Sequence, residues 1–122
     1  MSARRAVDVV VGLIGDSSGR WLVNCRPPGT PLAGSWEFPG GKARPGEAPL
    51  AALKRELDEE LGIEVLEAVP VLVLEHDYPD KRVRLDVWQV LKSSGRPTSG
   101  EGQPLRWVRA AECRDLPLLP AD

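Results

Sequence analysis

Six of the seven residues from Lys54 to Glu60 are charged, and three of them are glutamates, Glu56, Glu59 and Glu60. In a helix, side chains three and four positions apart are neighbours, so Glu56 would lie beside both of the other glutamates. Like charges at this spacing repel by about 0.2–0.5 kcal/mol per pair. Hard divalent cations bind clustered carboxylate oxygens, with water or phosphate completing the shell. The cluster therefore predicts a divalent metal site, and a solvated charged surface is the alternative.

The glutamates lie in the segment with the clearest helical pattern, from Ala48 to Leu61. Its leucines recur at spacings of three, four and four, which places them on one stripe of the helix: Leu50, Leu53, Leu57 and Leu61. Gly62 follows directly, where a glycine commonly ends a helix. At about 100° per residue, the glutamates point away from the leucine stripe, and Glu60 touches its edge. We expect the leucines to pack on a sheet while the glutamates remain accessible to a ligand.

Short strands and turns are predicted around this helix. The valine-rich run Ala6–Ile14 ends at a turn-forming Gly-Asp-Ser-Ser-Gly segment and Trp21–Asn24 resumes as a strand, so the two runs resemble a hairpin. We expect Pro39-Gly40-Gly41 to stop regular structure. The remaining predicted segments are a loop at Arg26–Ser35, strands at Trp36–Phe38, Val71–Glu75, Val83–Leu91 and Leu105–Val108, a linker at Ser93–Gln103 and a helical turn at Ala110–Arg114. Strands on both sides of one long helix predict a mixed sheet with the helix packed on it.

Length, charge and cysteine content limit the possible functions. A chain of 122 residues fits one domain. A formal net charge of −2 argues against binding to a nucleic-acid polymer, and metal ions would be needed to hold a small anionic substrate at an acidic patch. Cys25 and Cys113 are far apart, so we expect no disulfide framework and a cytoplasmic location. No apolar run is long enough to cross a bilayer.

The spacing from Gly41 to Ile63 fills every fixed position of a known 23-residue motif. The order is Gly41, five residues, Glu47, seven residues, Arg55-Glu56-Leu57, one residue, Glu59-Glu60, one residue, and Gly62-Ile63. On these residues the chain resembles the Nudix hydrolases. The resemblance implies an α/β/α sandwich with a central mixed sheet, in which the motif forms a loop, a helix and a second loop. It also implies hydrolysis of a nucleoside diphosphate linked to another group, with Mg²⁺ or Mn²⁺ as cofactor.

The resemblance also implies a role for individual residues. The implied metal ligands are the carboxylates of Glu56, Glu59, Glu60 and Glu101, together with the backbone carbonyl of Gly40. Arg55 would pair with a carboxylate and orient it, a bidentate role that lysine fills less well. Glu56 is the first choice for the general base that activates water, and Glu101 is the second. The structural residues of the motif are Gly41, Glu47 and Gly62.

The likeness extends over nearly the whole chain and points to the MutT-like branch, whose members act on oxidised guanine nucleotides. The residues implied to contact the nucleotide are Arg26, Glu37, Phe38, Pro39, Gly40 and Asp122. The implied reaction converts 8-oxo-dGTP or a dGTP-type nucleotide into the monophosphate and pyrophosphate. Two alternatives are a Nudix hydrolase of ADP-ribose or a dinucleoside polyphosphate, and a nucleotide-binding domain without catalysis.

The sequence departs from the branch at its C-terminal end. A Pro-Ala-Asn run reads the base in MutT-like enzymes, whereas this chain has Pro120-Ala121-Asp122. Asparagine both donates and accepts, as an oxidised guanine with an O6 acceptor and an N7 donor requires, but an ionised aspartate only accepts. With aspartate, one of the two hydrogen bonds to the oxidised base would be lost, at a cost of about 1–3 kcal/mol. The sequence therefore does not predict selectivity for 8-oxoguanine.

The final helix of that branch has no counterpart in the sequence. We therefore expect residues 1–122 to form one Nudix domain, acting as a monomer or homodimer or fused to a further C-terminal domain.

Overall fold

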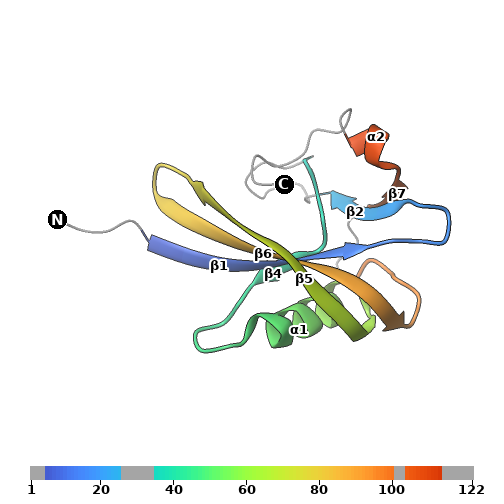
Figure 1. Ribbon diagram of the computed structural model, residues 1–122, viewed down its shortest axis with the longest axis horizontal. Helices are drawn as coiled ribbons and strands as arrows, with labels where there is room; N and C mark the ends of the chain where they lie inside the picture. Colours follow the sequence, from blue (N-terminus) through green and yellow to red (C-terminus); the bar gives the residue numbers. More distant parts are fainter. Residues whose placement is uncertain (1–4, 26–34, 101–103, 114–122) are drawn as a thin grey trace.

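The computed structural model describes residues 5–25, 35–100 and 104–113 (Figure 1). Within these ranges the strands form one four-stranded and one three-stranded sheet, and a long helix lies against the larger sheet. The elements are β1 (Arg5–Ile14), β2 (Trp21–Cys25), β3 (Trp36–Glu37), β4 (Gly40–Lys42), α1 (Pro49–Leu61), β5 (Glu64–Asp77), β6 (Lys81–Ser94), β7 (Leu105–Val108) and α2 (Ala110–Cys113). The described part of the chain contains no helix that is both long and apolar enough to cross a membrane.

The larger sheet is mixed, as the sequence predicted. Its strand order is β4-β1-β6-β5, with β1 and β6 parallel and the other two pairs antiparallel. The smaller sheet has the order β3-β2-β7 and is antiparallel. The architecture is that of an α/β sandwich with a central mixed sheet, and α1 covers one face of that sheet (Figure 1).

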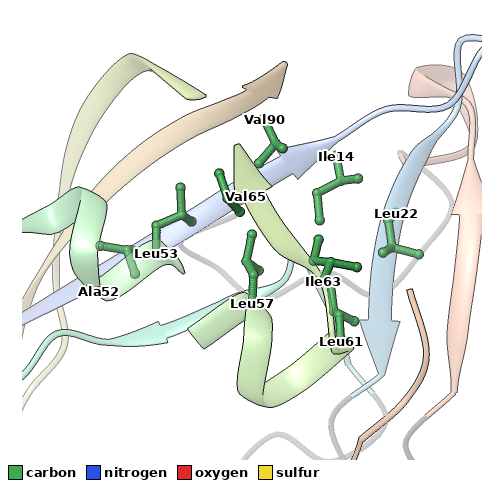
Figure 2. Packing of buried hydrophobic residues seen from close by; sticks show 10 residues of the cluster. Ile14, Leu22, Ala52, Leu53, Leu57, Leu61, Ile63, Val65 and Val90 are labelled. Carbon is green, nitrogen blue, oxygen red and sulfur yellow. The ribbon is translucent and has the colours of Figure 1, made fainter. Parts of the chain in front are cut away.

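The leucine stripe attaches α1 to the sheet, which confirms the helix prediction. Leu53, Leu57 and Leu61 are fully buried, and Leu50 is partly buried. Figure 2 shows these buried leucines in one cluster with residues of both sheets, Ile14, Leu22, Val65 and Val90, and with Ile63, which lies between α1 and β5. Gly62 ends the helix in the left-handed conformation, with φ of 69°, as expected for a C-terminal glycine. Because α1 is held on this side, its opposite side can present the glutamates.

The predicted hairpin between the first two strands is wrong. After the turn, β1 and β2 share only the isolated bridge between Gly15 and Trp21, and β2 then pairs with β3 and β7 in the smaller sheet. The Asp16 carboxylate accepts the backbone N–H groups of Ser18 and Arg20, so the turn itself is tight. The turn chemistry was visible in the sequence, but the choice of partner strands depends on residues much later in the chain.

The prediction that Pro39-Gly40-Gly41 stops regular structure is correct for β3, which ends at Glu37, but wrong for the two glycines. Gly40 and Gly41 belong to β4, which pairs antiparallel with β1 through Val11 and Val10. A β-carbon at position 40 would overlap the carbonyl oxygen of Val10 and lie 3.0 Å from the Val11 Cα. Glycine is required here because two backbones approach closely, not because the chain turns.

The later strands are longer than predicted. β5 and β6 each run for 14 residues, against predicted cores of Val71–Glu75 and Val83–Leu91. Their pairing contains register shifts near Glu67 and Val71, which interrupt the simple alternation that a sequence pattern needs. The predicted linker begins inside β6, which reaches Ser94. The strand predicted at Leu105–Val108 is confirmed as β7.

Candidate active site

The glycine-rich strand β4 lies against one of the glutamates of α1. A β-carbon at position 41 would collide with the Glu56 carboxylate, whose Oε1 would be 2.8 Å away. Glycine therefore allows a charged side chain from the helix to reach the backbone of the neighbouring strand. The two adjacent glycines act differently, because Gly40 makes room for β1 and Gly41 makes room for Glu56.

Arg55 connects the loop before α1, strand β4 and two of the glutamates. Its Nε and Nη2 atoms donate to both carboxylate oxygens of Glu47 at 2.9 and 2.8 Å. Its Nη1 donates to Glu56 at 2.9 Å and to Glu59 at 3.3 Å, and Nη2 also donates to the Lys42 carbonyl at 3.0 Å. Only a planar guanidinium with several fixed N–H groups can make this set of bonds, so lysine would not substitute.

The charge of Glu47 is strongly stabilised by this arrangement. Hydrogen bonds from Arg55, and then from the backbone N–H of Arg44, lower the pKa of the Glu47 carboxyl from its ordinary value of 4.5 to about 2. The same bonds, from Glu47 first and then Glu56, raise the pKa of Arg55 further above its usual value. The pair therefore stays ionised throughout the neutral and mildly acidic range.

The depressed pKa of Glu47 predicts a specific pH dependence of stability. Between pH 4.5 and about 2 the unfolded chain binds a proton at Glu47 that the folded chain does not, so stability is lost as the pH falls through this window. We expect Glu47→Gln to lack this component, and its urea midpoint to vary less with pH than that of the wild type. Urea midpoints measured from pH 2 to 6 test this. Parallel pH profiles for the two proteins would contradict it.

Glu60 has a different partner, from the smaller sheet. The Nδ2 atom of Asn24 donates to Glu60 Oε1 at 2.9 Å. Asn24 belongs to β2 and is only 3% exposed. Asn24 is not among the site residues predicted from the sequence. The available signal was a polar residue directly after the apolar run Trp-Leu-Val, two positions after Leu22 and so on the same strand face.

The segment after β6 closes over the C-terminal end of α1. The backbone N–H of Thr98 donates to the Leu61 carbonyl at 2.9 Å, and that of Gly100 donates to the Glu60 carbonyl at 3.0 Å. These bonds satisfy carbonyls that a helix end leaves without partners. The chain at Gly100 is thus fixed beside the helix end that carries Glu59 and Glu60.

The structure brings together most of the described residues that the sequence singled out. Glu47, Arg55, Glu56 and Glu59 share one network, and Gly41 contacts Glu56. Glu37 pairs directly with Asn24 between β3 and β2.

Two residues of the predicted nucleotide-contacting stretch take part in packing. Pro39 is buried and its carbonyl accepts the Gly12 N–H at 2.8 Å, while Phe38 packs on the separate apolar cluster of Val11, Val83 and Leu85. The predicted site residues Arg26, Glu101 and Asp122 lie outside the described residues.

The donor chemistry of this end of α1 fits a hard divalent cation. Carboxylate oxygens dominate it, and Gly41 admits the Glu56 carboxylate to the backbone of β4. Among the described residues, however, no three Asp, Glu, His or Cys side chains converge closely enough to hold one ion. Arg55 Nη1 donates to both Glu56 and Glu59, whereas Asn24 donates to Glu60, so these bonds hold the carboxylates in two groups. Glu59, with a side chain 52% exposed, is the least constrained by burial.

Comparison with known proteins identifies the class that this fold and site define. A family model described as NUDIX domain matches residues 10–122. The chain therefore belongs to the Nudix family, and it is a hydrolase acting on phosphoric anhydrides. Members of this family generally need divalent metal ions.

The particular branch follows from individual relatives. The chain is 36% identical over 118 residues to the CTP pyrophosphohydrolase of Escherichia coli K12, covering 97% of this chain and 87% of that protein. It is 35% identical over 104 residues to the 8-oxo-dGTP diphosphatase of the same organism, covering 85% and 81%. A MutT structure, from work on the Aliivibrio salmonicida and Vibrio cholerae proteins, matches with a TM-score of 0.81 at 32% identity, covering 96% of this chain and 90% of that one. The chain is thus a Nudix hydrolase of the MutT-like branch.

Proposed function

We propose that this protein hydrolyses nucleoside triphosphates of the 8-oxo-dGTP or dGTP type to the monophosphate and pyrophosphate, with Mg²⁺. The observation that carries the proposal is the Glu56 carboxylate, which is packed against Gly41 and held by Arg55 at 2.9 Å. This carboxylate is fixed in position by protein contacts, as a general base must be. Similarity to 8-oxo-dGTP diphosphatases over 85% of the chain supports the substrate class.

The proposed metal ligands are Glu56, Glu59 and Glu60, the Gly40 carbonyl and Glu101, with Mn²⁺ as an alternative to Mg²⁺. When bound, the cation neutralises charge on the phosphate oxygens. Glu56 takes the proton from the attacking water, with Glu101 as the second candidate. Arg55 orients Glu56, and Glu47 in turn orients Arg55 through two hydrogen bonds.

The proposed nucleotide contacts are Arg26, Glu37, Phe38, Pro39, Gly40 and Asp122. Among these, the identity of residue 122 favours a second candidate function, pyrophosphohydrolysis of a cytosine nucleotide. An ionised aspartate can only accept hydrogen bonds, and cytosine offers an exocyclic amino group that donates. The relative with 36% identity is named as a CTP pyrophosphohydrolase, which is consistent with this candidate.

A substrate panel separates these candidates. Steady-state kcat/KM is measured with Mg²⁺ for 8-oxo-dGTP, dGTP, CTP, dCTP and ADP-ribose. Under the first proposal 8-oxo-dGTP or dGTP has the highest kcat/KM of the panel, and a preference for 8-oxo-dGTP of at least about 10-fold, the equivalent of about 1.4 kcal/mol, would add selectivity for the oxidised base. If CTP or dCTP is best, the cytosine candidate replaces it, and Asp122→Asn should then lower the cytosine rate. A preference for ADP-ribose, or no turnover of any member, overturns both candidates.

The cytoplasmic location, the monomeric or homodimeric state and the single-domain organisation remain predictions from the sequence.

A further inference from the structure

Asn24 occupies a position where an apolar side chain would be expected. It is 3% exposed, and the preceding residues of β2, Leu22 and Val23, are 1% and 0% exposed. Burial of an amide is unfavourable unless its hydrogen bonds are replaced. A residue chosen only to pack β2 against the rest of the molecule would be apolar, so the amide needs a separate explanation.

The direction of the side chain supplies that explanation. Leu22 faces Leu61 and Ile63 at the C-terminal end of α1 (Figure 2). Residues two apart on a strand share a face, so Asn24 lies on the same face of β2 as Leu22 and also points toward α1. At that step the core ends, and the amide meets the Glu60 carboxylate at 2.9 Å.

The amide has one further hydrogen-bonding group. Asn24 Oδ1 is buried and has no hydrogen-bond partner among the described residues. The described hydrogen bond of the amide is thus the one that Nδ2 donates to the Glu60 carboxylate. An amide that leaves one buried acceptor without a partner is costly for packing alone, so its contact with Glu60 must account for it.

We propose that Asn24 is a positioning residue for metal binding, which holds the Glu60 carboxylate from the smaller sheet. The inference rests on the proposed role of Glu60 as a metal ligand. Arg55 holds Glu56 and Glu59 from the side of β4, and Asn24 holds Glu60 from β2. The two halves of the carboxylate set are thus oriented from two different sheets. Partners that orient metal ligands are commonly worth about 10–100-fold in metal affinity.

The test measures the dissociation constant of Mn²⁺ for the folded protein, without nucleotide. Electron paramagnetic resonance detects the free Mn²⁺ during the titration. We expect Asn24→Leu, which has a similar volume but no amide, to raise the Mn²⁺ dissociation constant by about 10–100-fold. Asn24→Ala is measured in parallel because it cannot overfill the position. A dissociation constant within twofold of the wild type in either folded variant overturns the inference. Loss of folding in both variants also overturns it, because the role would then be structural.

Two controls distinguish positioning from a general effect on the helix end. Thr98→Val removes a hydroxyl that contacts the Leu61 carbonyl at 3.4 Å, at the same end of α1, and should leave the Mn²⁺ dissociation constant within twofold. In the double variant Asn24→Leu/Glu60→Gln, the asparagine change should add nothing to the loss caused by Glu60→Gln. The same non-additivity should appear in metal-free urea midpoints. Additive losses in both measurements would contradict the inference.

A kinetic measurement completes the test. In Asn24→Leu the Mg²⁺ concentration for half-maximal activity should rise by about 10-fold or more, while kcat at saturating Mg²⁺ stays within threefold. If kcat at saturating Mg²⁺ instead falls by about 10-fold or more, and the Mg²⁺ concentration for half-maximal activity is unchanged, Asn24 has a structural role and the inference is overturned. If the wild type itself does not bind Mn²⁺, the proposed function fails. If the wild type binds Mn²⁺ and the variants bind it equally well, only the role of Asn24 is overturned.

Discussion

Glu56→Gln is expected to lower kcat at saturating Mg²⁺ by about 10²–10⁴-fold, the usual contribution of a general base. The amide is nearly the same size as the carboxylate, so it still fits against Gly41, but it cannot take a proton from water. Its oxygen can still accept from Arg55 Nη1, which now donates at 2.9 Å. The expected defect is therefore chemical, and it is measured by steady-state turnover with circular dichroism and thermal unfolding as checks of folding.

Glu64→Gln is the matched control for this prediction. Glu64 begins β5 just after α1, is exposed, and belongs to none of the contacts around Arg55, so its replacement should leave kcat unchanged. Turnover of Glu56→Gln close to the wild-type value would exclude Glu56 as the base. Glu101→Gln would then be the variant to measure.

Gly40→Ala is expected to prevent stable folding, with a loss of about 3 kcal/mol or more in the free energy of unfolding. The new methyl group would overlap the Val10 carbonyl oxygen, which is backbone and cannot rotate away. Strand β4 would have to separate from β1. The measurement is urea unfolding, and the control is Gly46→Ala. Gly46 has a positive φ of 75°, but no atom lies within 4 Å of its would-be β-carbon, so the cost should come from the backbone conformation alone and be only about 1–2 kcal/mol.

Gly41→Ala should have the opposite effect, with little loss of stability and a large loss of activity. Its methyl group would meet the Glu56 carboxylate, which is a side chain and can move, so we expect a nearly normal unfolding transition and a fall of about 10²-fold in kcat/KM. Similar stability losses at positions 40 and 41, or wild-type activity of Gly41→Ala, would contradict the two separate roles.

Local patterns predicted the helix and the chemistry it carries. The leucine spacing and Gly62 determine where α1 lies and ends, because both act within a few residues of the chain. The glutamate positions and Arg55 fall in a motif of fixed spacing, so the sequence also indicated which side chains would meet. The structure added that Arg55 binds Glu47, Glu56 and Glu59 at once.

Features that depend on distant pairing could not be read in the same way. Gly40 and Gly41 look like residues that stop a strand until β1 is placed beside them, and Trp21–Asn24 resembles half of a hairpin until β7 is placed beside it. Asn24 has no partner within its own strand, and its contact with Glu60 joins residues 36 positions apart. Sequence periodicity shows which residues of one strand or helix share a face. The roles of these residues depend instead on contacts with a second strand or helix that is distant in the sequence.

The excess of glutamates over arginines along α1 has a consequence for the order of events in catalysis. Glu47, Glu56, Glu59 and Glu60 carry four negative charges, and the ion pairs of the described residues place two arginines, Arg55 and Arg44, against them, so the glutamates outnumber these arginines by two. A nucleoside triphosphate adds more charge of the same sign and would be repelled at short range. Divalent ions must therefore enter before the nucleotide or together with it. The electrostatics of α1 thus make an ordered assembly, with cation first or as the nucleotide complex, the expected kinetic scheme.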